Sequence, residues 1–226
     1  MTIDTSRAAA IRGYFGSTGT GKSSAAKAWL RQRAADRLLI FDPEGEYDQL
    51  GPLCGAAELV ERLKVGLPRK AFRLRFMPPL RDRPAAFSTF CRIALVAAEQ
   101  AGGCVVVVDE LAEVVSSGKA IEGWGALVRT GRKRGIELVA CSIRPAEIDK
   151  TFWSQCTYVR SGRLTFGPDL QRMASVLGCD PEQLAGLKDL EYIERDIQAQ
   201  QGAETGTFRP AGRSKKTRAP ASGVVL

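Results

Sequence analysis

Histidine is absent from this sequence, and its absence removes several kinds of active site. Neither a Ser-His nor a Cys-His nucleophilic pair can form without it. The cysteines include no C-x-x-C pair, so we expect neither a zinc site nor a disulfide framework, but reduced and mostly buried thiols. They are Cys54, Cys91, Cys104, Cys141, Cys156 and Cys179.

Long apolar runs are missing as well. None approaches the roughly 20 residues that a helix needs to cross a bilayer, and the N-terminus lacks the apolar core of a signal peptide. We therefore expect no stable membrane insertion and a cytoplasmic protein. A chain of 226 residues with 44% hydrophobic residues is long enough to bury one large core.

Acidic residues are outnumbered by basic ones, which gives a formal net charge of +8. This excess points to an acidic partner such as nucleic acid. Half of it lies in residues 199–226, which are rich in Gly, Ala and Ser and poor in apolar residues. We therefore predict one domain over residues 1–198 and a disordered basic tail over 199–226. The tail is either a solubilising end or a flexible contact to a phosphate backbone.

One segment matches the phosphate-binding pattern G-x-x-x-x-G-K-[ST] in full. In this pattern the glycines let backbone N–H groups surround phosphates, Lys22 reaches the β- and γ-phosphates, and the Ser23 hydroxyl binds Mg²⁺. An expected strand at 11–15 and helix at 24–33 place the loop at a helix N-terminus, where free amides attract an anion. The alternative is a glycine-rich turn without a ligand. The predicted site comprises Gly16, Ser17, Thr18, Gly19, Thr20, Gly21, Lys22, Ser23 and Ser24.

A second chemical element comes after the apolar run 104–108, which ends in Asp109 and Glu110. A buried parallel strand would deliver both carboxylates to the carboxyl edge of a sheet. We predict that Asp109 holds the Mg²⁺ through its water shell and that Glu110 is the general base that polarises an attacking water. The alternative is an ordinary core strand whose terminal acids have no catalytic role.

Strands and helices alternate along the chain, which predicts a three-layer α/β fold with a mostly parallel sheet flanked by helices. With the phosphate-binding pattern at 16–23, this arrangement resembles P-loop NTPases of the RecA/ASCE type. The segment 71–76 alternates apolar and basic residues, so we expect a half-exposed strand near the sheet edge. The other expected strands are 38–42, 104–108, 136–142 and 157–160. The expected helices after the first are 56–64, 85–101, 121–133, 148–153, 169–177 and 181–187.

Four blocks of this chain resemble the FtsK/HerA superfamily of ring-forming ATPases that pump DNA. They are GSTGTGKSS (16–24), LLIFDPEGEY (38–47), VVVVDE (105–110) and RTGRKRGIELVACSIRPAEID (129–149). The first and third are common to most P-loop ATPases, whereas the second and fourth are more specific to the superfamily. The resemblance covers residues 11–160 and implies ATP and Mg²⁺ as cofactors, double-stranded DNA bound without sequence preference, and a homo-oligomeric ring.

Within this resemblance, many relatives carry glutamine where this chain has Ser142, as a sensor of the γ-phosphate or the attacking water. The shorter serine would act through a water molecule. A bare motor of this length looks most like the genome-packaging ATPases of tailless, membrane-containing icosahedral viruses. A capsid or portal-vertex protein is then the implied partner, with action in the host cytoplasm and in the virion.

The basic cluster 129–134 precedes the expected strand at 136–142. One reading is a solvated helix end, because a helix C-terminus attracts cations. The other is an arginine that reaches the γ-phosphate of a neighbouring subunit, for which Arg129 and Arg132 are the candidates and Arg144 a weaker one. Glu46 could contact DNA, the nucleotide or a neighbouring subunit, or could cap the turn at Asp42.

We therefore predict an ATP-hydrolysing translocase that packages double-stranded viral DNA. A plasmid or chromosomal DNA pump of the same superfamily is the alternative within the class. A small-molecule P-loop kinase and a nucleotide-gated scaffold are alternatives from other classes. The pair of acids at 109 and 110 argues against a kinase, because a kinase has no use for an activated water.

Overall fold

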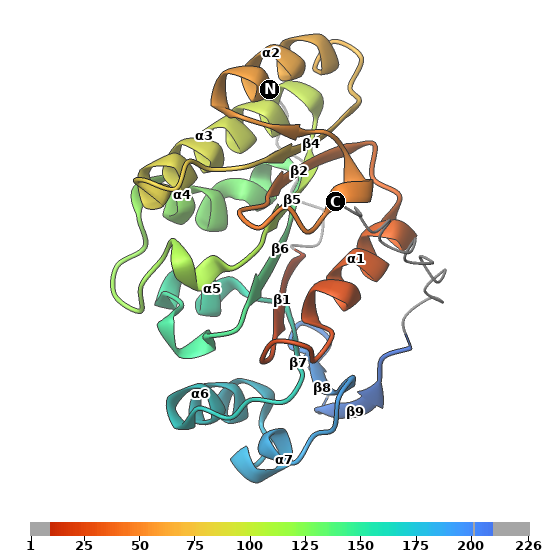
Figure 1. Cartoon of the computed structure of the whole chain (residues 1–226), viewed down its shortest axis with the longest axis vertical. Helices are drawn as coiled ribbons and strands as arrows, with labels where there is room; N and C mark the ends of the chain where they lie inside the picture. The colour runs from red at the N-terminus through yellow and green to blue at the C-terminus, as the bar shows by residue number, and fades with distance from the viewer. Residues whose placement is uncertain (1–9, 201, 210–226) are drawn as a thin grey trace, which may run out of the picture.

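The computed structural model describes residues 10–200 and 202–209, and within them nine strands form one sheet (Figure 1). The strand order is β3-β4-β2-β5-β6-β1-β7-β8-β9. Strands β1 to β7 run parallel, and β8 and β9 are antiparallel additions. The strands are β1 (Ile11–Phe15), β2 (Arg37–Phe41), β3 (Leu53–Cys54), β4 (Phe72–Phe76), β5 (Cys104–Val108), β6 (Ile136–Ser142), β7 (Tyr158–Ser161), β8 (Glu191–Asp196) and β9 (Glu204–Thr207).

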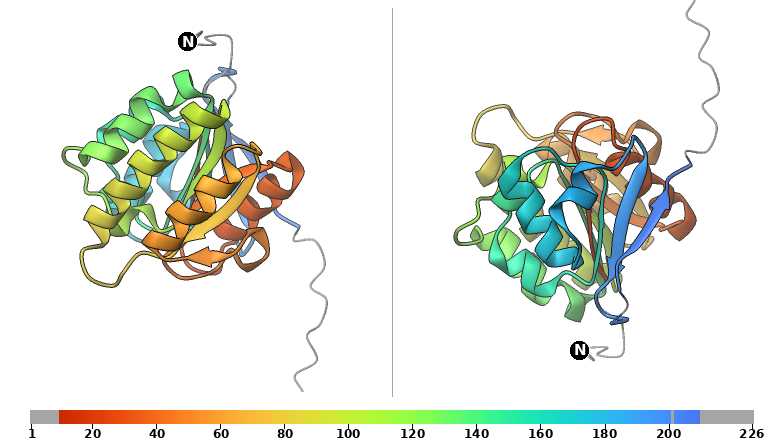
Figure 2. Two further views of the ribbon diagram at one scale, coloured as in Figure 1. Left: turned by 90° about the horizontal axis from the view of Figure 1, so that it is seen from above. Right: turned by 90° about the horizontal axis from the view of Figure 1, so that it is seen from below.

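Helices cover both faces of the sheet, and Figure 2 shows α1 alone on one side with α2, α3 and α4 on the other. The helices are α1 (Lys22–Arg33), α2 (Ala56–Gly66), α3 (Arg83–Ala101), α4 (Glu122–Thr130), α5 (Lys150–Gln155), α6 (Gly167–Leu177) and α7 (Pro181–Ala185). Short 3₁₀ turns are η1 (Asp48–Leu50), η2 (Leu111–Glu113), η3 (Gly131–Arg134) and η4 (Pro145–Glu147). The mostly parallel three-layer fold predicted from the sequence is thereby confirmed.

The alternation of side chains along the central strands divides the core into two parts. On β2, Leu39 and Phe41 belong to the larger core under α2 to α5, while Leu38 and Ile40 face α1. Strand β5 is buried along its whole length and contributes to both parts. A central strand packed on both faces is therefore a near-continuous apolar run, as the valines of 105–108 are.

Strand β4 departs from the half-exposed strand expected at 71–76. It lies inside the sheet because β3 pairs along its outer side, and its Arg75 is buried. The Arg75 guanidinium is 2.9 Å from the Asp42 carboxylate, and this pairing lets a charged residue occupy an interior position. Of the two basic residues in the alternation, Arg75 forms a buried ion pair, whereas Arg73 is partly exposed. Strand β4 lies next to the edge strand β3, so the expected position near the sheet edge is confirmed.

The predicted start of a disordered tail at residue 199 is wrong for the first part of that segment. Residues 204–207 form β9, which pairs antiparallel with β8 from Glu191–Thr207 to Glu194–Glu204. Both strands are polar and were not predicted, and they extend the sheet beyond β7 (Figure 2). Residues 210–226, which hold most of the tail's cations, lie outside the described residues.

The parallel strands give the sheet two distinct edges. The carboxyl edge is where the parallel strands end, at Phe15, Phe41, Val108 and Ser142. The amino edge is the opposite one, where the parallel strands begin and where α1, α2, α3 and η3 lead into the next strand. No helix in the described part of the chain is long and apolar enough to span a membrane.

Candidate nucleotide site

The four segments predicted to form the site meet at the carboxyl edge. They are the residues that follow β1, β2, β5 and β6. The register pairs Phe15 with Ser142, Phe41 with Val108, and Val108 with Ala140, so β1 and β6 extend two residues further toward this edge than β2 and β5. Strand β6 lies between β1, which leads into the glycine-rich loop, and β5, which leads into the two acids. This order places the end of β6 between the loop and the acids, so a phosphate group bound there could contact both.

The loop after β1 requires glycine at its bends. Gly16 has φ +137°, and a Cβ there would lie 2.5 Å from the Thr20 hydroxyl oxygen. That hydroxyl donates to the Ser17 carbonyl oxygen at 2.7 Å, and Ser17 N–H donates to the Arg163 carbonyl oxygen at 2.9 Å. Gly21, with φ +90°, ends the loop. The loop is thus held by a hydrogen bond within it and by one from the segment that follows β7.

The N-terminus of α1 is open to an anion. Gly21 is its N-cap and makes no side-chain cap, and the first turn holds no acidic residue. Ser23 is partly exposed and Ser24 is exposed in this turn. The unshared amides and the positive end of the helix dipole together suit a phosphate group.

Lys22 points across the edge to Glu110. Its Nζ lies 2.6 Å from Glu110 Oε1, and both side chains are largely buried. Burial acts to lower the pKa of Lys22, but the hydrogen bond and charge of Glu110 outweigh it and raise the pKa. The lysine therefore stays charged and joins two segments that are 88 residues apart in the sequence.

Asp109 sits deeper than Glu110. It is 1% exposed, and burial raises its pKa to about 7, with Lys22 opposing this and Glu110, Glu46 and Asp42 adding to it. Such a carboxylate has little to stabilise its charge and would gain from a nearby cation. Its neighbour Glu110 stands at φ +45°, at the turn into η2.

The acids and Ser23 fit a magnesium ion in the manner of P-loop proteins. Mg²⁺ prefers hard oxygen ligands and takes few of them from protein, the rest coming from water and phosphate. The Ser23 hydroxyl and the buried Asp109 carboxylate supply such oxygens. Among the described residues, no three His, Cys, Asp or Glu side chains gather into a metal-binding group.

Asp42 organises the turn that backs this site. Its carboxylate accepts from Glu46 N–H at 2.8 Å and Tyr47 N–H at 3.2 Å, and Arg75 neutralises it. Asp42, not Glu46, therefore closes the turn. The Tyr47 hydroxyl donates to Asp109 Oδ1 across 3.5 Å, while the Glu46 side chain pairs with Lys27 at 3.7 Å.

Ser142 ends β6 and is fully buried. Its hydroxyl oxygen accepts from Arg144 N–H at 3.1 Å. The Arg144 guanidinium pairs with Glu147 at 2.6 Å and Asp169 at 3.2 Å. Ser142 thus has the predicted location, while Arg144 is already occupied by two carboxylates.

Arg129 and Arg132 do not join this site in their own chain. They lie at the end of α4 and in η3, which precede β6, and so belong to the amino edge. Both are exposed. If either arginine contacts a bound phosphate, that phosphate must therefore lie at the carboxyl edge of another copy of the chain.

Sequence reasoning missed the C-terminal contribution to the site. A Cβ on Gly21 would lie 3.0 Å from Leu190 and 3.6 Å from Phe208, so both side chains flank the glycine-rich loop. A small cavity beside Lys22 is also lined by Arg160 and Tyr192. The Arg160 guanidinium stacks 3.7 Å from the Tyr192 ring centre and pairs with Glu194 at 2.6 Å. The only available signal was the arginine at the end of the predicted strand 157–160.

The site combines a phosphate-binding loop, an open helix N-terminus, and a lysine that faces paired acids from a strand two positions away. This combination defines a P-loop NTPase.

Comparisons with known proteins identify the family within this class. Residues 7–90 match the family described as the central domain of the helicase HerA. Protein P9 of Pseudoalteromonas phage PM2 is 32% identical over 204 residues, covering 89% of this chain and 87% of P9. The chain belongs to the FtsK/HerA superfamily of P-loop ATPases.

Solved structures share the fold. The genome packaging NTPase B204 from Sulfolobus turreted icosahedral virus 2, in complex with AMPPCP, has a TM-score of 0.70 at 16% identity, covering 90% of this chain and 98% of that one. The pCW3 conjugation coupling protein TcpA has a TM-score of 0.56 at 15% identity, covering 88% of this chain and 60% of that one. At these identities the likeness establishes a common architecture.

Proposed function

We propose that this protein is an ATP-hydrolysing translocase that packages double-stranded viral DNA into a capsid, acting from the host cytoplasm. The observation that carries the proposal is the meeting of Lys22 with the Asp109–Glu110 pair beneath an open helix N-terminus. The fold of the packaging NTPase B204, shared over 90% of this chain, supports the packaging part.

In the proposed reaction, the loop amides and Lys22 bind the β- and γ-phosphates of ATP. Ser23 and Asp109 would hold Mg²⁺, which when bound neutralises charge on the phosphate oxygens. Tyr47 keeps the Asp109 carboxylate oriented through its hydroxyl. The charge on Lys22 is maintained by its acidic neighbours, so it is ready to meet an anion.

Glu110 has a different role. In the free protein its carboxylate holds Lys22 at 2.6 Å. Arrival of a triphosphate offers Lys22 a stronger anionic partner, and Glu110 is then released to orient and deprotonate a water. Ser142, at the end of the strand between the loop and the acids, would contact that water or the γ-phosphate through a bridging water.

We further propose that the site is completed by a second subunit in a homo-oligomeric ring. The charge that develops on the γ-phosphoryl group needs a cation besides Lys22. The arginines on β7 and in the described loops after β6 and β7 are engaged by carboxylates: Arg160 by Glu194, Arg163 by Asp189, and Arg144 by Glu147 and Asp169. Arg129 or Arg132 of a neighbouring copy is the proposed source.

Displacement of a third strand from a DNA triplex tests translocation directly. Wild-type protein with ATP should release the third strand from a linear duplex, and Glu110→Gln should bind ATP but fail to release it. A protein that hydrolyses ATP and never displaces the strand would refute the translocase proposal. It would leave the ATPase assignment intact.

A further inference from the structure

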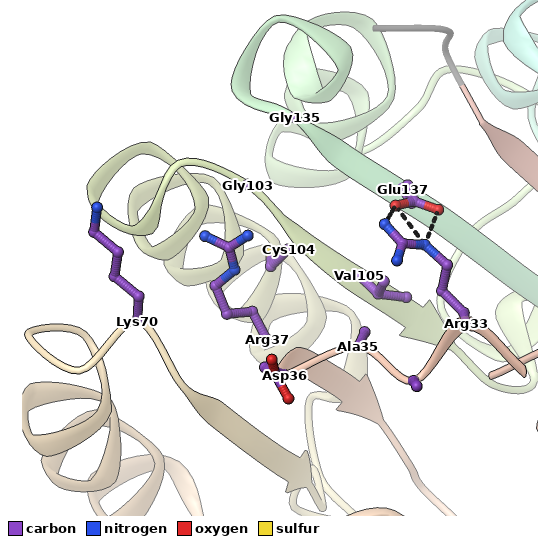
Figure 3. Close-up of a pocket in the computed structure, with 11 residues that line it drawn as sticks. Arg33, Ala35, Asp36, Arg37, Lys70, Gly103, Cys104, Val105, Gly135 and Glu137 are labelled. Carbon is purple, nitrogen blue, oxygen red and sulfur yellow. Dashed lines mark hydrogen bonds and ion pairs between the residues drawn. The ribbon is translucent and has the colours of Figure 1, made fainter. Parts of the chain in front are cut away.

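A second hollow lies at the amino edge, which is at the opposite end of the parallel strands from the glycine-rich loop. Its volume is about 380 Å³, and its walls are the loops that lead into β2, β4, β5 and β6. The charged side chains of this amino-edge groove are Arg33, Asp36, Arg37, Lys70 and Glu137 (Figure 3). Ligands of open α/β sheets normally bind at the carboxyl edge, so this groove is not part of the nucleotide site.

Basic residues surround the groove well beyond its walls. The segments at this edge are 31–37, 67–71, 99–105 and 129–137, and together they hold nine cations against three acids. The cations are Arg31, Arg33, Arg37, Arg69, Lys70, Arg129, Arg132, Lys133 and Arg134, and the acids are Asp36, Glu99 and Glu137. A surface with this balance attracts polyanions.

Helix dipoles explain only part of this charge. Arg31 and Arg33 occupy the last turn of α1, where cations are favoured, and Arg33 is already paired with Glu137. Arg37 donates to the Ala101 carbonyl oxygen at the end of α3. These residues have a structural reason to be basic.

Arg69 and Lys70 have no such reason. They lie just after α2, their side chains are exposed, and neither makes an ion pair or side-chain hydrogen bond within the described residues. Lys70 also stands at φ +51°, a conformation that a non-glycine residue adopts at a cost. In Figure 3 its side chain and that of Arg37 extend in the same direction above the groove.

We infer that the amino-edge groove binds the sugar-phosphate backbone of double-stranded DNA, with Arg69 and Lys70 as its main phosphate contacts and Arg37 as a supporting one. The inference rests on the proposed translocase function. A translocase must hold any sequence, which charged contacts to phosphates allow. Cations that come from separate loops along an open edge match a line of phosphates better than one small anion. DNA and ATP would then occupy opposite edges and bind together.

This use of the edge is compatible with an arginine acting on a neighbouring subunit. Lys70 precedes β4, whereas Arg129 and Arg132 precede β6. Three strand spacings separate β4 from β6 in the sheet, which is about 14 Å. One region can therefore face DNA while the other faces the next subunit.

Paired double variants test the inference. Arg69→Ala with Lys70→Ala, the groove variant, removes Lys70 from the wall of the groove and Arg69 from the turn beside it. Arg62→Ala with Lys64→Ala removes two cations from the exposed face of α2, where each is paired with an acid of the same helix, and serves as the control. Binding of a duplex of about 30 base pairs is measured by fluorescence anisotropy at several salt concentrations, alongside ATP hydrolysis without DNA.

The groove variant should bind the duplex several-fold more weakly. Its plot of log affinity against log salt should be less steep by roughly 1 to 2, since each phosphate contact contributes about 0.9 to the slope. The control and the basal hydrolysis of both variants should match wild type. Equal losses in the two variants, or none in the groove variant, would overturn the groove inference alone. Wild-type protein that binds no duplex would overturn the DNA-translocase proposal with it.

Discussion

The two edges of one sheet carry opposite charge. The loops at the carboxyl edge hold ten acids and four cations, in segments 16–22, 42–48, 77–82, 109–113, 143–149 and 162–165. The amino-edge segments hold nine cations and three acids. Two of the acids at the first edge have partners that shape the site: Asp42 closes a turn and pairs with Arg75, and Glu110 pairs with Lys22. A parallel sheet thus separates a site for a metal and a triphosphate from a surface suited to a polyanion.

The largest loss of activity should come from substitution of Lys22 at the carboxyl edge. Lys22→Ala should abolish ATP hydrolysis and weaken triphosphate binding, because the residue is the cation that faces both the loop and the acids. Lys27→Ala, five residues further along α1 and paired with Glu46, is the matched control and should stay active. Near-normal turnover by Lys22→Ala would rule out the phosphate-loop assignment.

Substitution of Glu110 should affect ATP turnover but not ATP binding. Glu110→Gln should retain ATP binding while turnover falls by roughly 10²-fold or more, the usual scale for loss of a general base. Glu113→Gln, an exposed acid three residues on that pairs with Arg83, is the control. Binding by equilibrium fluorescence and turnover by phosphate release should therefore diverge for Glu110→Gln only. A parallel loss of both would make Glu110 a structural partner of Lys22.

Mixing variants tests whether the two edges meet between subunits. Arg129→Ala or Arg132→Ala should be inactive alone, as should Lys22→Ala. In a mixture of the two kinds, some interfaces join an intact loop to an intact arginine, so hydrolysis should recover to a fraction of wild type. Lys133→Ala, an exposed cation of the same cluster, should be active alone. Full activity of both arginine variants alone would remove the cluster from catalysis.

A smaller effect concerns stability and pH. The folded protein binds the Asp109 proton more tightly than the unfolded chain, with a pKa of about 7 against 3.8. This carboxyl therefore lowers stability as pH rises from about 4 to 7. Asp109→Asn should have a melting temperature a few degrees above that of wild type at pH 8. Each kcal/mol added to the free energy of unfolding raises the melting temperature by about 3 °C in a domain of this size. The difference should shrink at pH 5, as differential scanning fluorimetry without nucleotide can show. A difference in melting temperature that grows toward low pH would contradict a raised pKa of Asp109.

Local patterns predicted the phosphate loop and the central strands because each is encoded by neighbouring residues. The bounds of β6, for example, agree with the expected 136–142. Strands β8 and β9 escaped prediction because sequences such as Glu204–Thr207 are polar edge strands with little apolar patterning. The pairing of Asp42 with Arg75 could not be predicted, since it joins positions 33 residues apart.

The rate of ATP hydrolysis in the presence of linear duplex DNA of increasing length tests the central claim most directly. A motor that hydrolyses ATP at one edge while it tracks along DNA should turn over faster as the DNA lengthens, because end dissociation becomes less frequent. We predict stimulation by wild-type protein that rises with length, and none by Glu110→Gln. Hydrolysis by the wild type that no length of duplex changes would contradict the account.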